Sequence, residues 1–110
     1  MTVFGKGLLG EMRARRYLQR QGMRFLRGRY RAAHGEIDLI MKDGETIVFT
    51  EVKYRSDGMP GSGVRAVDAD KRRRLKQAAG VYLSLYPADD VRFDVVEITR
   101  SGIRHIRSAF

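Results

Sequence analysis

Apolar and polar positions along the chain first predict two helices. Residues 5–21 carry an inward-facing stripe that repeats about every 3.6 residues, made of Leu8, Glu11, Ala14 and Leu18. Gly22 is expected to end this helix. A second helix is predicted over residues 67–85, ahead of Pro87, with an apolar stripe of Leu75, Ala78, Ala79, Tyr82 and Leu85.

Shorter runs predict strands between and after these helices. Residues 23–31 look like a basic strand interrupted at Gly28, whereas 35–42 and 46–54 are rich in Ile, Val, Phe and Thr. The expected strands cover residues 23–31, 35–42, 46–54, 91–99 and 103–107. Asp43-Gly44 is a strong hairpin signal, because both turn positions need a positive φ. Residues 56–64 hold three glycines and a proline and are expected to form a loop. The order αβββαββ predicts one α/β domain over residues 1–110, with a mixed β-sheet flanked by helices.

The hairpin turn also predicts how its two strands pair. If Lys42 faces Glu45, the register sets Asp38 opposite Phe49. Glu51 is then the diagonal neighbour of Asp38, with Cβ atoms roughly 7–8 Å apart. Because side chains alternate along a strand, Asp38 and Glu51 are expected on the same face of the sheet.

Two carboxylates at that separation can hold one hard divalent cation between them. The surrounding positions are apolar, so the carboxylates lose solvation and repel each other unless a cation lies nearby. Mg²⁺ prefers carboxylate oxygens together with water and phosphate oxygens. Lys53 follows on the same face, where its ammonium could orient an attacking water or stabilise developing charge. The alternative is an ordinary solvent-facing strand on which acidic and basic residues alternate.

Charge and composition narrow the class of partner. The chain has 110 residues and a formal net charge of +9, from 22 Lys and Arg against 13 Asp and Glu. Such an excess favours a polyanion, with nucleic acid as the expected partner and an anionic membrane surface as the competing one. No segment is long and apolar enough to span a bilayer, and residues 1–10 do not resemble a signal peptide. The absence of cysteine excludes disulfides and thiol catalysis and agrees with a cytoplasmic location.

Glu11 and two basic clusters offer further chemistry. Glu11, on the inward stripe of the first helix, is either a further ligand or a group that orients the metal-bound water. The alternative is a structural partner for Arg15 or another basic residue at the edge of the stripe. The run Lys71 to Arg74 either clamps phosphates or forms a solvated helix face. Four arginines are interleaved with Phe25 and Tyr30, namely Arg24, Arg27, Arg29 and Arg31. This pattern suits phosphate pairing and base stacking on nucleic acid. The alternative is an ordinary edge strand with arginines on its exposed face. The two histidines, His34 and His105, are expected to be structural or exposed.

These residues also carry a resemblance that spans nearly the whole chain. Its most specific parts are the GEIDLI segment at 35–40 and the EVK-x-R segment at 51–55. Further matching residues are Gly10-Glu11, Ala14, Tyr17-Leu18, Gly22, Tyr30-Arg31, Lys71, Tyr82-Leu83, Arg92-Phe93-Asp94 and Ala109-Phe110. The chain resembles the YraN-like family of small bacterial proteins. That family is similar to the Holliday-junction resolvases of the PD-(D/E)xK nuclease superfamily.

The resemblance implies a restriction-endonuclease-like core that binds Mg²⁺ or Mn²⁺ at the hairpin. Asp38 matches the motif aspartate of the superfamily, Glu51 and Lys53 match its (D/E)xK, and Glu11 matches the helix glutamate of the resolvases. Two positions depart from the pattern. Ile37 stands where the motif has proline, and Arg29 stands where relatives more often carry asparagine.

The sequence therefore predicts a metal-dependent endonuclease that hydrolyses phosphodiester bonds of DNA, with branched or flapped DNA as candidate substrates. Asp38 and Glu51 would hold the metal, while Lys53 and Glu11 would act on the attacking water. Nucleic-acid contacts are expected from Arg29, Arg31, Arg55, Lys71, Arg72 and Arg73. A homodimer is expected by analogy with the resolvases. The alternatives are a non-catalytic nucleic-acid-binding protein and an adaptor in DNA repair or uptake.

Overall fold

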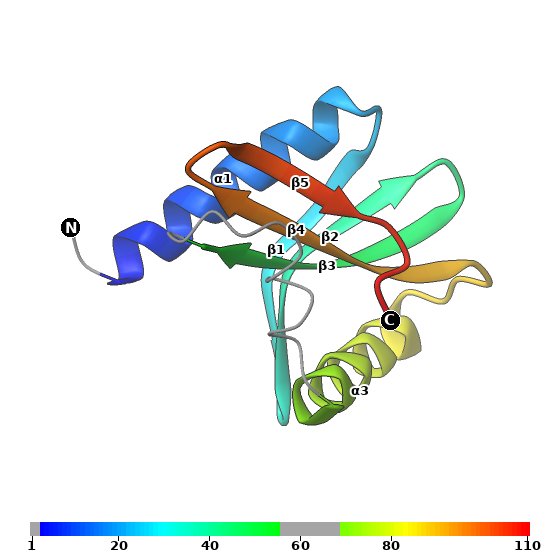
Figure 1. Cartoon of the computed structure of the whole chain (residues 1–110). Coiled ribbons are helices and arrows are strands. Elements are labelled where there is room, and N and C mark those ends of the chain that lie inside the picture. Colours follow the sequence, from blue (N-terminus) through cyan, green and yellow to red (C-terminus); the bar gives the residue numbers. More distant parts are fainter. Residues whose placement is uncertain (1–2, 56–68) are drawn as a thin grey trace.

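Seven helices and strands make up the part of the chain that the computed structural model describes, residues 3–55 and 69–110 (Figure 1). They are α1 (Val3–Arg20), β1 (Arg24–Ala32), β2 (Gly35–Asp43), β3 (Thr46–Tyr54), α3 (Ala69–Leu85), β4 (Val91–Thr99) and β5 (Gly102–Ile106). The predicted order αβββαββ is confirmed, with element ends within two residues of the expected ones wherever these are described. The expected loop at 56–64 and the expected helix start at 67 lie outside the described residues.

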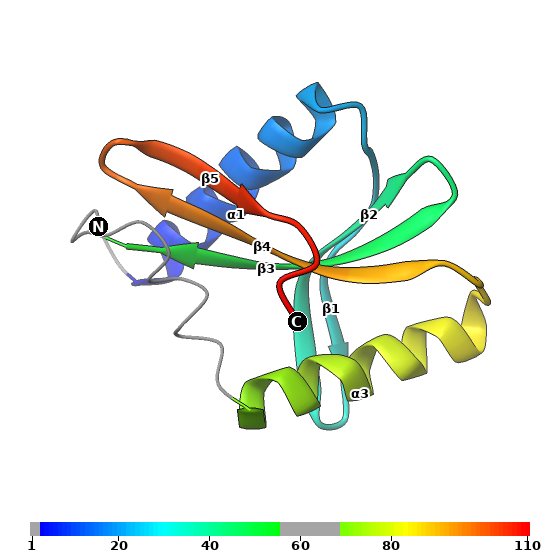
Figure 2. The same ribbon diagram turned by 45° about the vertical axis from the view of Figure 1, so that its right-hand side comes forward.

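The strands form one mixed sheet in the order β1-β2-β3-β4-β5 (Figure 2). Neighbouring strands are antiparallel except β3 and β4, which are parallel. Antiparallel neighbours need only a short turn, whereas a parallel pair needs a crossover, and α3 provides it here.

A hydrophobic core lies on each face of the sheet, because alternate residues of the strands point to opposite sides. On one face, Phe49 packs with residues of α3, including Leu75 and Tyr82. On the other face, the neighbouring Val48 packs with residues of α1, including Leu18. The two helices therefore cover opposite faces.

Two members of the predicted helix stripes do not enter these cores. Leu8 is 41% exposed, at the rim of an apolar cavity that Met12 and Phe25 also line. Leu85 is 64% exposed, because α3 ends at this residue. Both helices consequently carry exposed apolar side chains beyond their packed faces.

The register predicted for the hairpin is wrong by two residues. Asp43 pairs with Thr46, so the turn residues are Gly44, at φ 61°, and Glu45. The physical reason is that Asp43 is held in the sheet by Arg92, whose Nη1 lies 2.9 Å from Asp43 Oδ2. A shift of two residues keeps every side chain on its predicted face.

Gly35 begins β2 in direct contact with α3. A Cβ at this position would collide with the backbone carbonyl of Arg74, a group that cannot rotate away. Gly35→Ala is therefore expected to lower the free energy of unfolding by about 1–3 kcal/mol. Urea denaturation would measure it, with Gly80→Ala as a control because a Cβ there meets no heavy atom within 4 Å outside the neighbouring backbone of α3. Equal stability of the Gly35→Ala variant and wild type would contradict the close approach.

Candidate active site

The site lies where β2 and β3 separate. Their paired residues end at Leu39 and Thr50, while β2 continues beside β1 and β3 continues beside β4 (Figure 2). Continuing the observed register by one pair sets Asp38 opposite Glu51, not diagonal to it as expected from the sequence. The Val52 backbone N–H donates to Asp38 Oδ2 at 2.8 Å. The aspartate side chain thus takes the place of a backbone acceptor at this fork.

The two carboxylates are buried together. Glu51 is only 4% exposed, and Asp38 is half-buried. Burial raises the pKa of Asp38 to about 8, and repulsion from the Glu51 carboxylate acts in the same direction. The Val52 hydrogen bond opposes this rise but does not cancel it. A buried acidic pair of this kind is held under electrostatic strain when both groups are ionised.

Two lysines converge on the Glu51 carboxylate. Its Oε1 lies 2.9 Å from Lys71 Nζ and 3.4 Å from Lys53 Nζ. Burial lowers the pKa of Lys53, and contact with Lys71 lowers it further. Burial also acts to lower the pKa of Lys71, but the contacts of Lys71 with Lys53 and Glu51 outweigh burial and raise that pKa. Lys53 is therefore the more readily deprotonated amine of the two.

Two cavities open onto the carboxylates from different sides. One, of about 220 Å³, is lined by Glu11 and Gly10 of α1 together with Asp38 and Glu51. The other, of about 280 Å³, is lined by Lys71 of α3 together with the same two carboxylates. The fold thus brings together the four residues expected at the site, Glu11, Asp38, Glu51 and Lys53, and adds Lys71 directly to them.

Glu11 pairs with Arg29 of β1 and not with Arg15. Its Oε1 lies 2.6 Å from Arg29 Nε, whereas the Arg15 guanidinium lies over the Phe25 ring at 3.7 Å. Arg29 has φ 50°, a left-handed conformation that costs energy for a residue with a long side chain. Asparagine tolerates this region, which gives a physical reason for the asparagine implied there by the resemblance. Arg29 thus reaches Glu11 from a strained backbone position.

The donor chemistry of the pair fits a divalent cation. A cation would relieve the repulsion that raises the pKa of Asp38. Within residues 3–55 and 69–110, no group of three His, Cys, Asp or Glu side chains is arranged to hold a metal ion. Two protein carboxylates suffice for Mg²⁺, which usually keeps several waters and adds substrate phosphate oxygens.

The basic residues predicted to contact nucleic acid occupy different surroundings. Arg31 and Arg73 line a large cleft next to the site. The Arg72 guanidinium lies over the Phe110 ring at 5.5 Å, so it points toward the C-terminus. Arg55, at the end of β3, is half-buried and donates its backbone N–H to Ile98. Arg74, which the sequence indicates only as part of the run Lys71 to Arg74, lines both the cleft and the cavity beside Glu51.

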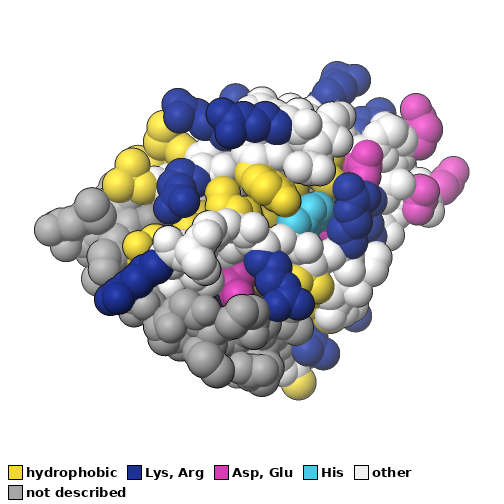
Figure 3. Space-filling view, turned by 45° about the horizontal axis from the view of Figure 1, so that its top comes forward, with side chains coloured by type: hydrophobic (Ala, Val, Ile, Leu, Met, Phe, Trp, Pro, Cys, Tyr) yellow, Lys and Arg dark blue, Asp and Glu magenta, His cyan; other side chains and the backbone are white. Residues whose placement is uncertain are grey.

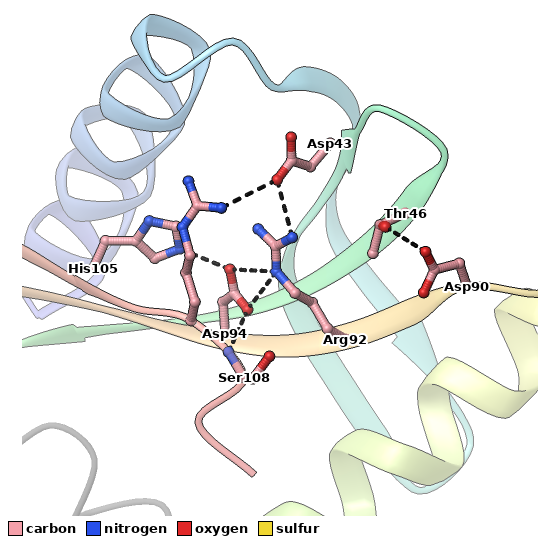
Figure 4. Close-up of polar contacts among 8 residues, drawn as sticks. Asp43, Thr46, Asp90, Arg92, Asp94, His105 and Ser108 are labelled. Atoms are coloured by element: carbon pink, nitrogen blue, oxygen red, sulfur yellow. Dashed lines mark hydrogen bonds and ion pairs between the residues drawn. The ribbon is translucent and has the colours of Figure 1, made fainter.

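The sequence interpretation also missed a polar network on the α1 face, drawn in Figure 4. Asp94, fully buried, accepts hydrogen bonds from His105 at 2.7 Å, Arg92 at 3.0 Å and the Ser108 backbone at 3.0 Å. Burial alone would raise the pKa of Asp94, but these donors outweigh it and lower that pKa. The sequence feature that could have indicated this network is Asp94 itself, an aspartate among the apolar residues of β4. The expected structural role of His105 is confirmed, and the network ties β5 and the C-terminal residues to the sheet.

The surface carries the charge excess unevenly. Figure 3 shows one face on which Lys and Arg side chains lie around hydrophobic ones, while most of the visible acidic side chains lie at one end. Among the described residues, no helix has both the length and the apolar character needed to cross a membrane.

The fold and the site define the class of protein. A five-stranded mixed sheet flanked by two helices, in the order αβββαββ over the described residues, is a restriction-endonuclease-like α/β core. Its acidic pair lies where the β2–β3 hairpin opens.

The chain belongs to the uncharacterised protein family UPF0102, whose family model matches residues 10–98. A UPF0102 protein of Shewanella halifaxensis is 42% identical over 106 residues, covering 96% of this chain and 94% of that protein. One from Vibrio campbellii is 46% identical, covering 93% and 89%. The UPF0102 protein YraN of Salmonella arizonae is 40% identical, covering 100% and 87%. The resemblance to YraN-like proteins is confirmed.

Proposed function

We propose that the chain is a metal-dependent endonuclease that hydrolyses phosphodiester bonds of DNA, with branched or flapped DNA as its favoured substrates. The observation that carries the proposal is the buried pair Asp38 and Glu51, with two lysine ammonium groups next to it. The raised pKa of Asp38 and the lowered pKa of Lys53, beside a cavity, are typical of catalytic sites. The net charge of +9 supports a polyanionic substrate.

Each residue at the fork has a role that follows from its surroundings. Asp38 and Glu51 would hold Mg²⁺ or Mn²⁺, which supplies Lewis-acid stabilisation and a more acidic bound water when present. Lys53, with its lowered pKa, would hold or release a proton at Nζ next to the scissile phosphate. Lys71 would balance charge on Glu51, and Glu11 would orient water in the smaller cavity.

A specific observation also favours a second candidate, a non-catalytic nucleic-acid-binding protein. Glu51 is already neutralised by Lys71 and Lys53, so the site can be stable without a cation. The basic surface alone would then bind DNA. We place either activity in the cytoplasm, in agreement with the lack of cysteine, and a homodimer stays an expectation.

Metal binding separates the two candidates. Mn²⁺ is expected to raise the free energy of unfolding by about 2.7 kcal/mol at 100 times its Kd, because it binds only the folded chain. Asp38→Asn should abolish this rise by removing one ligand charge. Glu45→Gln, in the exposed hairpin turn, is the matched control and should keep it. Calorimetric unfolding with and without Mn²⁺ measures the effect. Wild type that does not respond to millimolar Mn²⁺ would favour the binding protein.

A further inference from the structure

We propose that a cleft beside the candidate active site binds a single-stranded segment of the nucleic acid, with bases inside the cleft. The cleft has a volume of about 840 Å³ and lies between the β1–β2 turn and α3. Figures 1 and 2 both show this turn next to the first half of α3. The proposal rests on the proposed function, which identifies the ligand as DNA. It adds that the bound form is single-stranded and that it lies in this cleft.

The cleft is continuous with the site. Arg74 and Glu36 line both the cleft and the cavity of about 280 Å³ that contains Asp38 and Glu51. Gly35 lies between them, and its lack of a side chain lets α3 approach β2 closely. A strand that occupies the cleft is therefore led past the two carboxylates.

The charge of the cleft suits a phosphate backbone. Three guanidinium groups line it, from Arg31, Arg73 and Arg74, against the single carboxylate of Glu36. Each arginine makes an ion pair within the chain, Arg31 with Glu36 and the other two with Asp70. These side chains are more than half exposed, and exposed pairs contribute little stability. Replacing the carboxylate partner of each arginine by a phosphate therefore costs little free energy.

The rest of the lining suits bases. His34 offers an imidazole face, Gln77 offers an amide, and Ala33 offers an exposed methyl group. The cleft is wide and open, and its volume of about 840 Å³ leaves room for bases as well as backbone. A duplex keeps its bases stacked inside, whereas a single strand can turn them into a pocket and stack them on side chains. The single-stranded form therefore uses the whole cleft.

The test measures binding without cleavage. Anisotropy of a labelled short oligothymidylate and of a duplex of equal length would be recorded in EDTA. Ala33→Leu fills the cleft without changing charge and should weaken single-strand binding about tenfold while leaving the duplex unchanged. Arg31→Ala with Arg73→Ala should reduce the single-strand salt slope by about 1.4, at about 0.7 for each phosphate contact. Arg16→Ala with Arg20→Ala, exposed on α1, is the charge-matched control.

The outcomes either support or overturn the cleft. Equal losses in the two double variants would overturn it, because net charge alone would then explain binding. The proposal is also overturned if Ala33→Leu leaves single-strand binding intact, or if it weakens duplex binding as much as single-strand binding. Because binding is measured without metal, its result is independent of cleavage. If wild type binds as expected in EDTA yet cuts nothing in a separate assay with Mn²⁺, the nuclease is removed and the cleft is kept.

Discussion

Lys53→Ala is expected to lower the rate of DNA cleavage by about 10²–10³-fold while Mn²⁺ binding is kept. Lys53 Nζ lies 3.4 Å from Glu51 and has a pKa lowered by burial, so it contributes a proton or a charge without being a ligand. Asp38→Asn and Glu51→Gln should lose both cleavage and metal binding. Single-turnover cleavage of branched, flapped, single-stranded and linear DNA, together with Mn²⁺ calorimetry, measures the two effects separately.

The catalytic residues should also act as one unit. Each single carboxylate variant is expected to be nearly as inactive as the double variant, because groups that act together are not additive. Lys42→Ala, at the other end of the hairpin, is the control for loss of a lysine and should cut normally. If Lys53→Ala cuts as fast as wild type, the role given to Lys53 is wrong although the enzyme class stands. If wild type binds DNA and Mn²⁺ but cuts no substrate, the non-catalytic nucleic-acid-binding protein is the remaining candidate.

Local patterns were sufficient to predict the fold. Alternation along each strand placed Asp38, Glu51 and Lys53 on one face, and this survived a register error because the error was an even number of residues. The glycine signals were equally local, since Gly22 and Gly44 both adopt a positive φ. Periodicity and turn chemistry depend only on neighbouring residues in the sequence, so a single sequence contains all the information needed to predict them.

Partners across the fold could not be predicted in the same way. Glu11 and Arg29 meet only because α1 crosses β1, and Lys71 reaches Glu51 only because α3 begins beside the fork. The register itself depended on Arg92, which is far from the hairpin in sequence and holds Asp43 in the sheet. Each case needs the packed arrangement, because many arginines and lysines in a chain of net charge +9 could have served equally well.

Asp38→Asn is expected to make the metal-free protein more stable at alkaline pH. The folded-state pKa of Asp38 is raised to about 8 from an ordinary value of 3.8. Between these values the folded chain keeps a proton that the unfolded chain has released, so wild-type stability falls as pH rises from about 4 to about 8. Asparagine cannot ionise and still accepts from the Val52 N–H. At pH 9 the variant should therefore be more stable by about 3 kcal/mol or more, with little difference near pH 4.

A second aspartate tests the sign of this effect within the same chain. The pKa of Asp94 is lowered by its hydrogen bonds, so its carboxylate stabilises the fold above about pH 4 and loses that contribution as pH falls further. Asp94→Asn should thus be destabilised at every pH from 5 to 9, the opposite of Asp38→Asn. Urea denaturation of wild type and both variants in EDTA across this range measures the two differences. A parallel pH dependence of wild type and Asp38→Asn would mean that Asp38 holds no extra proton. The electrostatic strain that makes the pair a metal site would then be absent.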